Sequence, residues 1–102
     1  MTKVAAIQMV STPVVEENIA TARRLIGEAA SQGADLVLLP EYWPGIGYND
    51  TEKLQHAEVF GKGVIQDFMA EMARENGIWL IGGTLSLVSD EPGKVLNSSL
   101  VY

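Results

Sequence analysis

The sequence predicts an α/β fold in which strands and helices alternate along the chain. Val4–Val10 is rich in apolar and β-branched residues, which strands favour. Asp35–Leu39 is a short apolar run, typical of a strand that is buried on both faces. Between these two runs, apolar residues recur at the spacing of an amphipathic helix. A strand, a helix and a buried strand in this order predict a right-handed βαβ unit with parallel strands.

The first helix is expected over about Val15–Ser31. Pro13 suits the turn that leads into it, and Glu16 and Glu17 lie in its first turn, where the helix dipole favours acids. Gly33 follows the helix and suits the left-handed conformation that commonly ends one. The apolar stripe consists of Ile19, Ala22, Leu25, Ile26, Ala29 and Ala30.

Two more helices are expected in the middle of the chain. Asn49–Thr51 can cap a short helix that continues to about Ala57. A longer helix is predicted from about Gly63 to Glu75, because pairs of apolar residues repeat there every four residues. Asn76-Gly77 ends it.

The remaining segments predict two strands and a turn. Ile78–Leu85 reads as a third buried strand, Ser89–Lys94 as a polar turn, and Val95–Tyr102 as a fourth strand. The last two strands are expected to form an antiparallel hairpin. Because no linker, repeat or low-complexity tract divides the chain, we expect a single domain over residues 1–102.

Composition and charge exclude several classes of function. Thirteen acidic and seven basic residues give a net charge of −6, and the basic residues form no cluster, which argues against a nucleic-acid or membrane surface. Cysteine is absent, so these residues hold no disulfide, thiolate metal ligand or cysteine nucleophile. The apolar runs are too short for a membrane span, and the first residues lack the pattern of a signal peptide. We therefore expect a cytoplasmic protein.

Glu41 is the candidate catalytic residue. It follows the strand that stops at Pro40, and α/β sheets place their chemistry at the carboxyl ends of strands. A carboxylate held against Tyr42 and Trp43 would be partly desolvated, which raises a carboxyl pKa toward the range of a general base. From the residue pattern alone, a solvated acid at the end of a strand is an equally good interpretation.

Other polar residues suggest structural roles. His56 is the only histidine and stands in a polar stretch, so an exposed position on a helix is expected rather than a metal site. Gly82-Gly83 lies within an apolar run, where glycine allows close approach of a neighbouring backbone, and its context does not fit a phosphate-binding loop. We predict no metal and no cofactor.

In these motifs and their order, the chain resembles the N-terminal part of a carbon–nitrogen hydrolase of the nitrilase superfamily. The resemblance covers essentially the whole chain in order and spacing. It rests on Ala6–Gln8, on Asn18 in the first helix, on Gly33–Glu41, on Ile81–Thr84 and on Asn97–Tyr102.

The resemblance implies an α-β-β-α sandwich, of which this chain would be the N-terminal portion, ending in a β-hairpin. Members of the family hydrolyse non-peptide amides or nitriles through a Glu-Lys-Cys triad without a metal. Glu41 matches the glutamate, whereas the family's lysine and cysteine follow a strand like Asn97–Tyr102, and Lys62 and Lys94 are misplaced for that role. The domain is therefore expected to be incomplete: either a fragment of a longer enzyme, which we favour, or an inactive truncated product.

The resemblance also makes Tyr42, Trp43 and Tyr48 candidate substrate-binding residues, although each could equally pack its loop against the core. The implied partner is a small amide or nitrile of unspecified identity, and a homo-oligomer is expected for the full-length form. Two alternatives stay open. One is a non-catalytic α/β module that pairs with another chain through a strand edge or apolar face. The other is a flavodoxin-like regulatory domain, which lacks support because no second acid follows the first strand.

Overall fold

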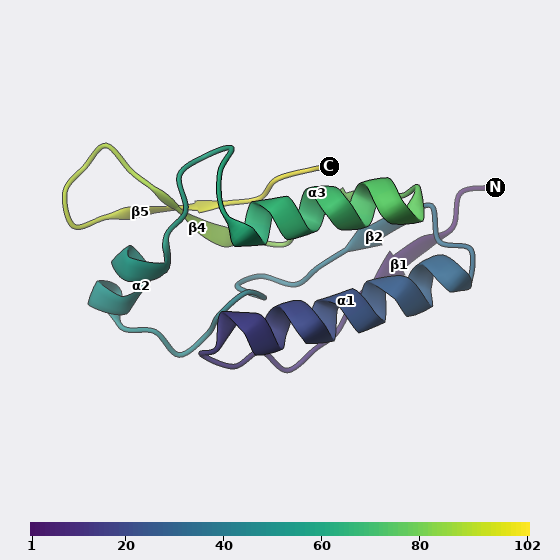
Figure 1. Cartoon of the computed structure of the whole chain (residues 1–102), viewed down its shortest axis with the longest axis horizontal. Coiled ribbons are helices and arrows are strands. Elements are labelled where there is room, and N and C mark those ends of the chain that lie inside the picture. The colour runs from purple at the N-terminus through teal and green to yellow at the C-terminus, as the bar shows by residue number, and fades with distance from the viewer.

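The computed structural model describes the backbone of residues 1–102 and every side chain except that of Asp50. It has the predicted mixed α/β fold (Figure 1). The elements in chain order are β1 (Val4–Ala6), α1 (Val15–Ser31), β2 (Leu36–Leu38), α2 (Asp50–His56), α3 (Val64–Asn76), β3 (Trp79–Ile81), β4 (Leu85–Val88) and β5 (Val95–Ser98).

The main sheet is parallel, with the strand order β1-β2-β3, so β2 is its central strand. This confirms the predicted parallel βαβ unit. The end of the chain extends the sheet: the backbones of Leu80 and Tyr102 exchange two hydrogen bonds of 2.9 Å, and Val101 forms an antiparallel bridge with Ile81. The free edge of β3 is thereby paired.

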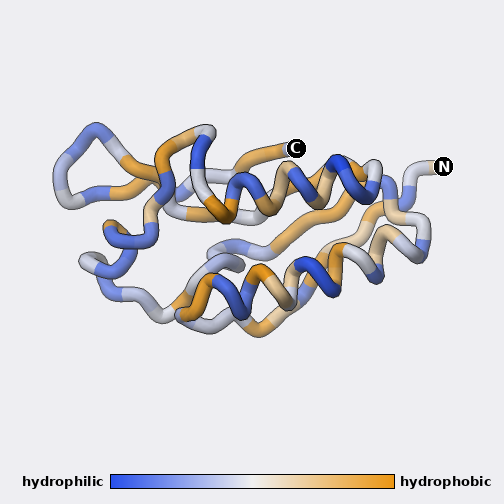
Figure 2. Tube along the Cα trace, viewed as in Figure 1, coloured by the Kyte–Doolittle hydropathy of each residue, from blue (hydrophilic) through white to orange (hydrophobic). Residues whose placement is uncertain are grey.

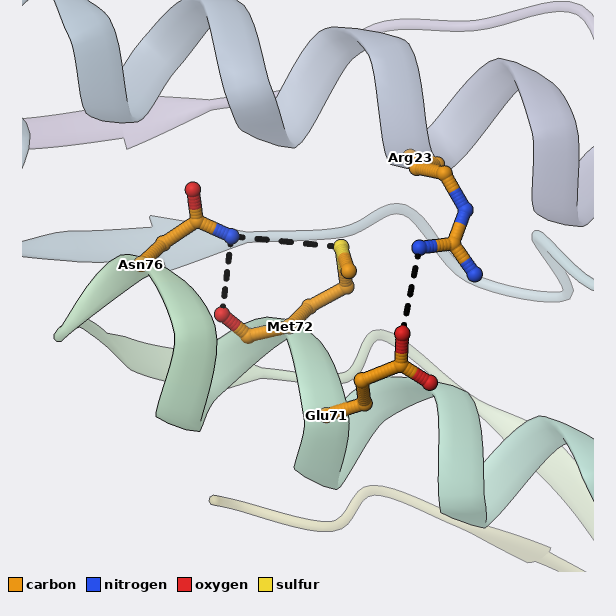
Figure 3. A network of polar contacts seen from close by, with 4 residues as sticks. All are labelled: Arg23, Glu71, Met72 and Asn76. Carbon is orange, nitrogen blue, oxygen red and sulfur yellow. Dashed lines mark hydrogen bonds and ion pairs between the residues drawn. The ribbon is translucent and has the colours of Figure 1, made fainter.

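Helices α1 and α3 cover one face of this sheet (Figure 1). Along both helices hydrophilic and hydrophobic residues alternate, whereas β2 is continuously hydrophobic (Figure 2). Arg23 of α1 and Glu71 of α3 form an ion pair of 3.3 Å between the two helices (Figure 3). Both side chains are partly exposed, so the pair adds little to stability. The core between sheet and helices includes Ala22, Ile26, Val37, Leu39, Phe68, Met69, Met72 and Leu80.

The opposite face of the sheet is apolar and open to solvent. Side chains alternate between the two faces of a strand, so the residues on either side of the buried Val37 and Leu80 point away from the helices. Val4 is 62% exposed, Leu38 40% and Trp79 66%. We call this surface the open sheet face.

The structure corrects the prediction of one continuous strand over Ile78–Leu85. The chain leaves the sheet after Ile81 and starts a separate strand, β4, at Leu85. The cause is Gly83, whose φ of 59° is not that of a strand, and which lies so close to the segment after β2 that a Cβ atom there would overlap the carbonyl oxygen of Pro40. The predicted close approach at Gly82-Gly83 is thus confirmed.

The predicted C-terminal hairpin is present, formed by β4 and β5 in an antiparallel pair. The helix predictions also hold. Helix α1 has the expected bounds, Asn49 caps α2 by accepting a 2.8 Å hydrogen bond from the backbone N–H of Glu52, and Gly77 ends α3 in the left-handed conformation. The first strand is shorter than predicted, at three residues.

Candidate functional site

The turn that follows β2, residues 41–44, carries the candidate base. Glu41 lies just beyond the carboxyl end of the central strand, and its side chain is exposed. The next residue, Tyr42, has φ = 53°. Among the described residues, no other residue except glycine has a positive φ. Such a backbone is strained for a residue with a Cβ, and strain of this kind is concentrated at functional sites. A 2.8 Å hydrogen bond from the Tyr42 N–H to Oγ1 of Thr84 helps to hold it.

Three further hydrogen bonds fix the turn to the rest of the chain. The indole N–H of Trp43 donates to the carbonyl oxygen of Gly82 at 2.8 Å. The Ser11 hydroxyl donates to the carbonyl oxygen of Trp43 at 2.9 Å, and the Asn18 amide donates to that of Pro44 at 2.7 Å. The turn is therefore attached to the segments after β1 and β3 and to helix α1.

Beside this turn lies a cavity of about 230 Å³, between the loop that follows β2, helix α2 and strand β4. Its walls are largely aromatic and aliphatic, with a lysine, a histidine and a serine among them. The lining includes Tyr42, Ile46, Tyr48, Lys53, His56, Ile65, Leu85 and Ser86.

Two ring contacts organise the side of the cavity that faces α2. The rings of Tyr48 and His56 are stacked, with centroids 4.4 Å apart and planes 6° from parallel. Nζ of Lys53 lies 5.5 Å from the centroid of the Tyr42 ring, within the range of a cation–π contact. A positive charge and two aromatic faces therefore meet at this wall.

The pKa of Tyr48 is raised above its ordinary value of 10.0. Burial contributes most, and the negative charges of Glu52 and Glu16 add to it. The Tyr48 hydroxyl donates a hydrogen bond of 2.5 Å to the carbonyl oxygen of Pro13. Tyr48 is therefore a neutral donor that ties the loop to the start of α1.

The structure brings together some of the sequence-predicted site residues and separates others. Tyr42 and Tyr48 both line the cavity. Trp43 is completely buried and packs the loop against the core, with its ring 5.7 Å from that of Phe68. Glu41 is exposed and does not belong to the cavity lining. Its role as general base stays a prediction.

Sequence reasoning missed Lys53 as a site residue and missed the stacking of His56, which it placed correctly on an exposed helix surface. A signal was present, because residues three apart on a helix lie on the same face. Lys53 and His56 have that spacing within the predicted short helix. Their ring partners come from a loop, and no local pattern indicates that contact.

Glu58 was also missed, and its role is structural. Its carboxylate accepts hydrogen bonds from the backbone N–H groups of Ile65 at 2.7 Å and Gln66 at 3.1 Å. These N–H groups lie at the start of α3 and have no partner within the helix, and the helix dipole favours an anion there. Gly63 precedes the helix because a Cβ atom there would overlap this carboxylate.

Within the described part of the chain, no three histidine, cysteine, aspartate or glutamate side chains are placed to bind a metal together. Nor is any of the described helices long and apolar enough to cross a membrane.

Comparison with known proteins gives a consistent result. The chain is 35% identical over 100 residues to the omega-amidase NIT2-A of Xenopus laevis, and 38% identical over 96 residues to the deaminated glutathione amidase of Synechocystis. These alignments cover 98% and 93% of this chain but 35% of each relative. The chain therefore spans about a third of the length of the curated relatives it matches.

Solved structures of nitrilase-superfamily members resemble this chain as well. Nit3 of Saccharomyces cerevisiae, a member of branch 10 of the nitrilase superfamily, superposes with a TM-score of 0.86 at 25% identity, over 99% of this chain and 39% of that one. The NitFhit protein of C. elegans gives a TM-score of 0.75 at 28% identity, over 99% of this chain and 26% of that one. The sequence profile of carbon-nitrogen hydrolases matches residues 3–102. A match over nearly every residue, with the fold of a solved nitrilase-superfamily member, means that this chain belongs to the carbon–nitrogen hydrolase family.

Proposed function

We propose that this chain is the general-base segment of an amidase-type carbon–nitrogen hydrolase, with Glu41 as the base. The observation that carries the proposal is the position of Glu41 in a turn at the carboxyl end of the central strand, directly before the strained backbone of Tyr42. Sheets of this kind bind ligands outside the carboxyl ends of their strands. The hydrogen bonds that fix the turn supply the rigidity that a catalytic group needs.

The proposed chemistry is the Glu-Lys-Cys route. Glu41 accepts the proton of a cysteine thiol, and the sulfur attacks the carbonyl carbon of the amide. A lysine stabilises the negative charge that develops on the carbonyl oxygen. The protonated Glu41 then passes the thiol proton to the nitrogen, so that the C–N bond breaks and the amine leaves. Water, activated by the same carboxylate, then hydrolyses the thioester. The chain contains no cysteine, so the nucleophile must come from residues other than these 102. The triad lysine in this proposal also comes from outside them.

The substrate class in this proposal is a small, non-peptide amide. The relatives named omega-amidase and deaminated glutathione amidase support an amide. The cavity beside the turn has room for a small organic group, and Tyr42 and Tyr48 would contact it. We also propose that the full-length enzyme is cytoplasmic and forms a homo-oligomer.

The test places residues 1–102 in a protein with the complete triad. The chain replaces the matching segment, about a third, of the Synechocystis deaminated glutathione amidase, and release of product from that relative's amide substrate is measured. Glu41→Gln keeps the shape of the side chain but cannot accept the thiol proton, so the turnover rate should fall by about 10²–10⁴-fold with KM nearly unchanged.

Glu75→Gln is the matched control, because Glu75 is also an exposed carboxylate but lies near the end of α3. It should leave turnover unchanged. A Glu41→Gln protein that keeps most of its turnover would return Glu41 to the role of a surface acid. The 102-residue chain alone should hydrolyse no amide. Turnover by the isolated chain that Glu41→Gln abolishes would show that the triad mechanism is wrong.

A second candidate function is a non-catalytic module that binds another chain. The observation in its favour is the open sheet face, since large exposed apolar patches commonly mark interaction surfaces. Gel filtration tests it. A stable monodisperse monomer would contradict this candidate.

A further inference from the structure

We propose that Asn18 is a positioning residue for Glu41, holding the turn from which that carboxylate projects. The inference rests on the proposed role of Glu41 as general base. Its structural part, that one buried amide controls the conformation of the turn, can be tested without any catalysis.

The polar atoms of Asn18 are fully engaged although the residue is only 1% exposed. Oδ1 accepts a hydrogen bond from the backbone N–H of Thr12 at 2.8 Å. Nδ2 donates to the carbonyl oxygens of Thr12 and Pro44, each at 2.7 Å. Thr12 lies in the segment after β1, and Pro44 ends the turn after β2. One side chain of α1 therefore joins the segments that follow two neighbouring parallel strands.

These three bonds require a carboxamide. The site needs one acceptor and two N–H donors on a short planar group, which only asparagine combines at this length. Aspartate has the same shape and can still accept from Thr12, but its second oxygen would face two carbonyl oxygens. A buried carbonyl that loses its donor is destabilised, so the substitution strains the contact with Pro44 in particular.

The turn is held from two sides. On one side, Oγ1 of Thr84 accepts from the N–H of Tyr42. On the other, Asn18 holds the carbonyl oxygen of Pro44, two residues later. The left-handed backbone of Tyr42 persists only while its surroundings enforce it. Release of Pro44 would let Tyr42 relax, and the Cα–Cβ bond of Glu41, one residue earlier, would change direction.

The structural test uses amide hydrogen exchange in the 102-residue chain. Asn18→Asp should accelerate exchange at the Tyr42 amide by roughly tenfold or more, because local opening of the turn becomes easier. Exchange in the β4–β5 hairpin should not change. Asn76→Asp is the matched control: Asn76 Nδ2 donates to the carbonyl oxygen of Met72 at 2.9 Å in α3 (Figure 3), away from the turn. An unchanged Tyr42 amide in Asn18→Asp would overturn the inference.

The catalytic test uses the protein with the complete triad described above. Asn18→Asp should lower kcat by roughly 10- to 100-fold, as expected for a displaced catalytic group, with little change in KM. Because Asn18 acts through Glu41, the double variant Asn18→Asp/Glu41→Gln should be no slower than Glu41→Gln alone. Multiplied losses in the double variant would show that Asn18 has only a general structural role.

The role of Glu41 as the base and the role of Asn18 in holding the turn are tested independently. If Glu41→Gln has no effect on turnover, the proposed function is wrong, while the exchange experiment still decides whether Asn18 holds the turn. If Asn18→Asp does not fold, Asn18→Ala replaces it, since that change removes the bond to the Pro44 carbonyl without placing a carboxylate oxygen against it. It should accelerate exchange at Tyr42 in the same direction, and no change there would contradict the proposal.

Discussion

The indole nitrogen of Trp43 lies 2.8 Å from the carbonyl oxygen of Gly82 and donates a hydrogen bond to it. Both residues are buried, so neither group has water as an alternative partner. The bond joins the turn after β2 to the point where the chain leaves β3. The two segments at the carboxyl ends of β2 and β3 are thus held together by one aromatic side chain.

Trp43→Phe should destabilise the chain by about 1–3 kcal/mol, since the buried Gly82 carbonyl would lose its donor. The free energy of unfolding in urea measures this loss. Trp79→Phe is the control, because Trp79 is 66% exposed on the open sheet face and such surface changes usually stay within about 0.5 kcal/mol. Equal effects of the two substitutions would contradict the importance of the bond.

Gly83→Ala should be strongly destabilising. Two costs add: roughly 1–2 kcal/mol for a left-handed backbone with a Cβ atom, and roughly 1–3 kcal/mol for overpacking against the Pro40 carbonyl oxygen. Gly93→Ala separates them, because Gly93 also has a positive φ, of 78°, but has open space around it. Thermal unfolding should show the larger loss for Gly83→Ala. A similar loss in both variants would mean that the close approach to Pro40 does not matter.

The raised pKa of Tyr48 predicts a loss of stability in alkaline solution. The folded chain disfavours the tyrosinate, through burial first and then through Glu52 and Glu16. This contribution is complete below pH 10.0, the ordinary pKa, and is lost as the pH rises through the higher folded value. Titration of tyrosinate absorbance, with Tyr48→Phe subtracted, locates the transition. Glu52→Gln should shift it toward pH 10.0, whereas Glu91→Gln in the hairpin turn should leave it in place. A Tyr48 that ionises at or below pH 10.0 would contradict this assignment.

Much of the fold could be predicted because its signals are local. The period of apolar residues in α1, the cap at Asn49 and the glycine at position 77 each depend on neighbours within a few positions. The parallel pairing followed from the order of elements, since a strand, a helix and a buried strand have one favoured arrangement.

The break between β3 and β4 could not be predicted in the same way. Ile78–Leu85 is apolar apart from its two glycines and Thr84. The break comes at Gly83, which has a positive φ and lies against the carbonyl of Pro40, about forty residues earlier. The candidate site shows the same limit. Tyr42 and Trp43 are adjacent aromatic residues in one loop, yet one lines the cavity and the other fills the core. The backbone between these two side chains has the positive φ of Tyr42, which no local pattern in the sequence predicts.

The open sheet face has a consequence for how copies of this chain behave toward one another in water. The net charge of −6 keeps copies apart, while the hydrocarbon of Val4, Leu38 and Trp79 draws them together. Any salt screens the repulsion, but sulfate, which is excluded from protein surfaces, also strengthens the attraction between apolar groups. At equal ionic strength, the chain should therefore be less soluble in sulfate than in chloride.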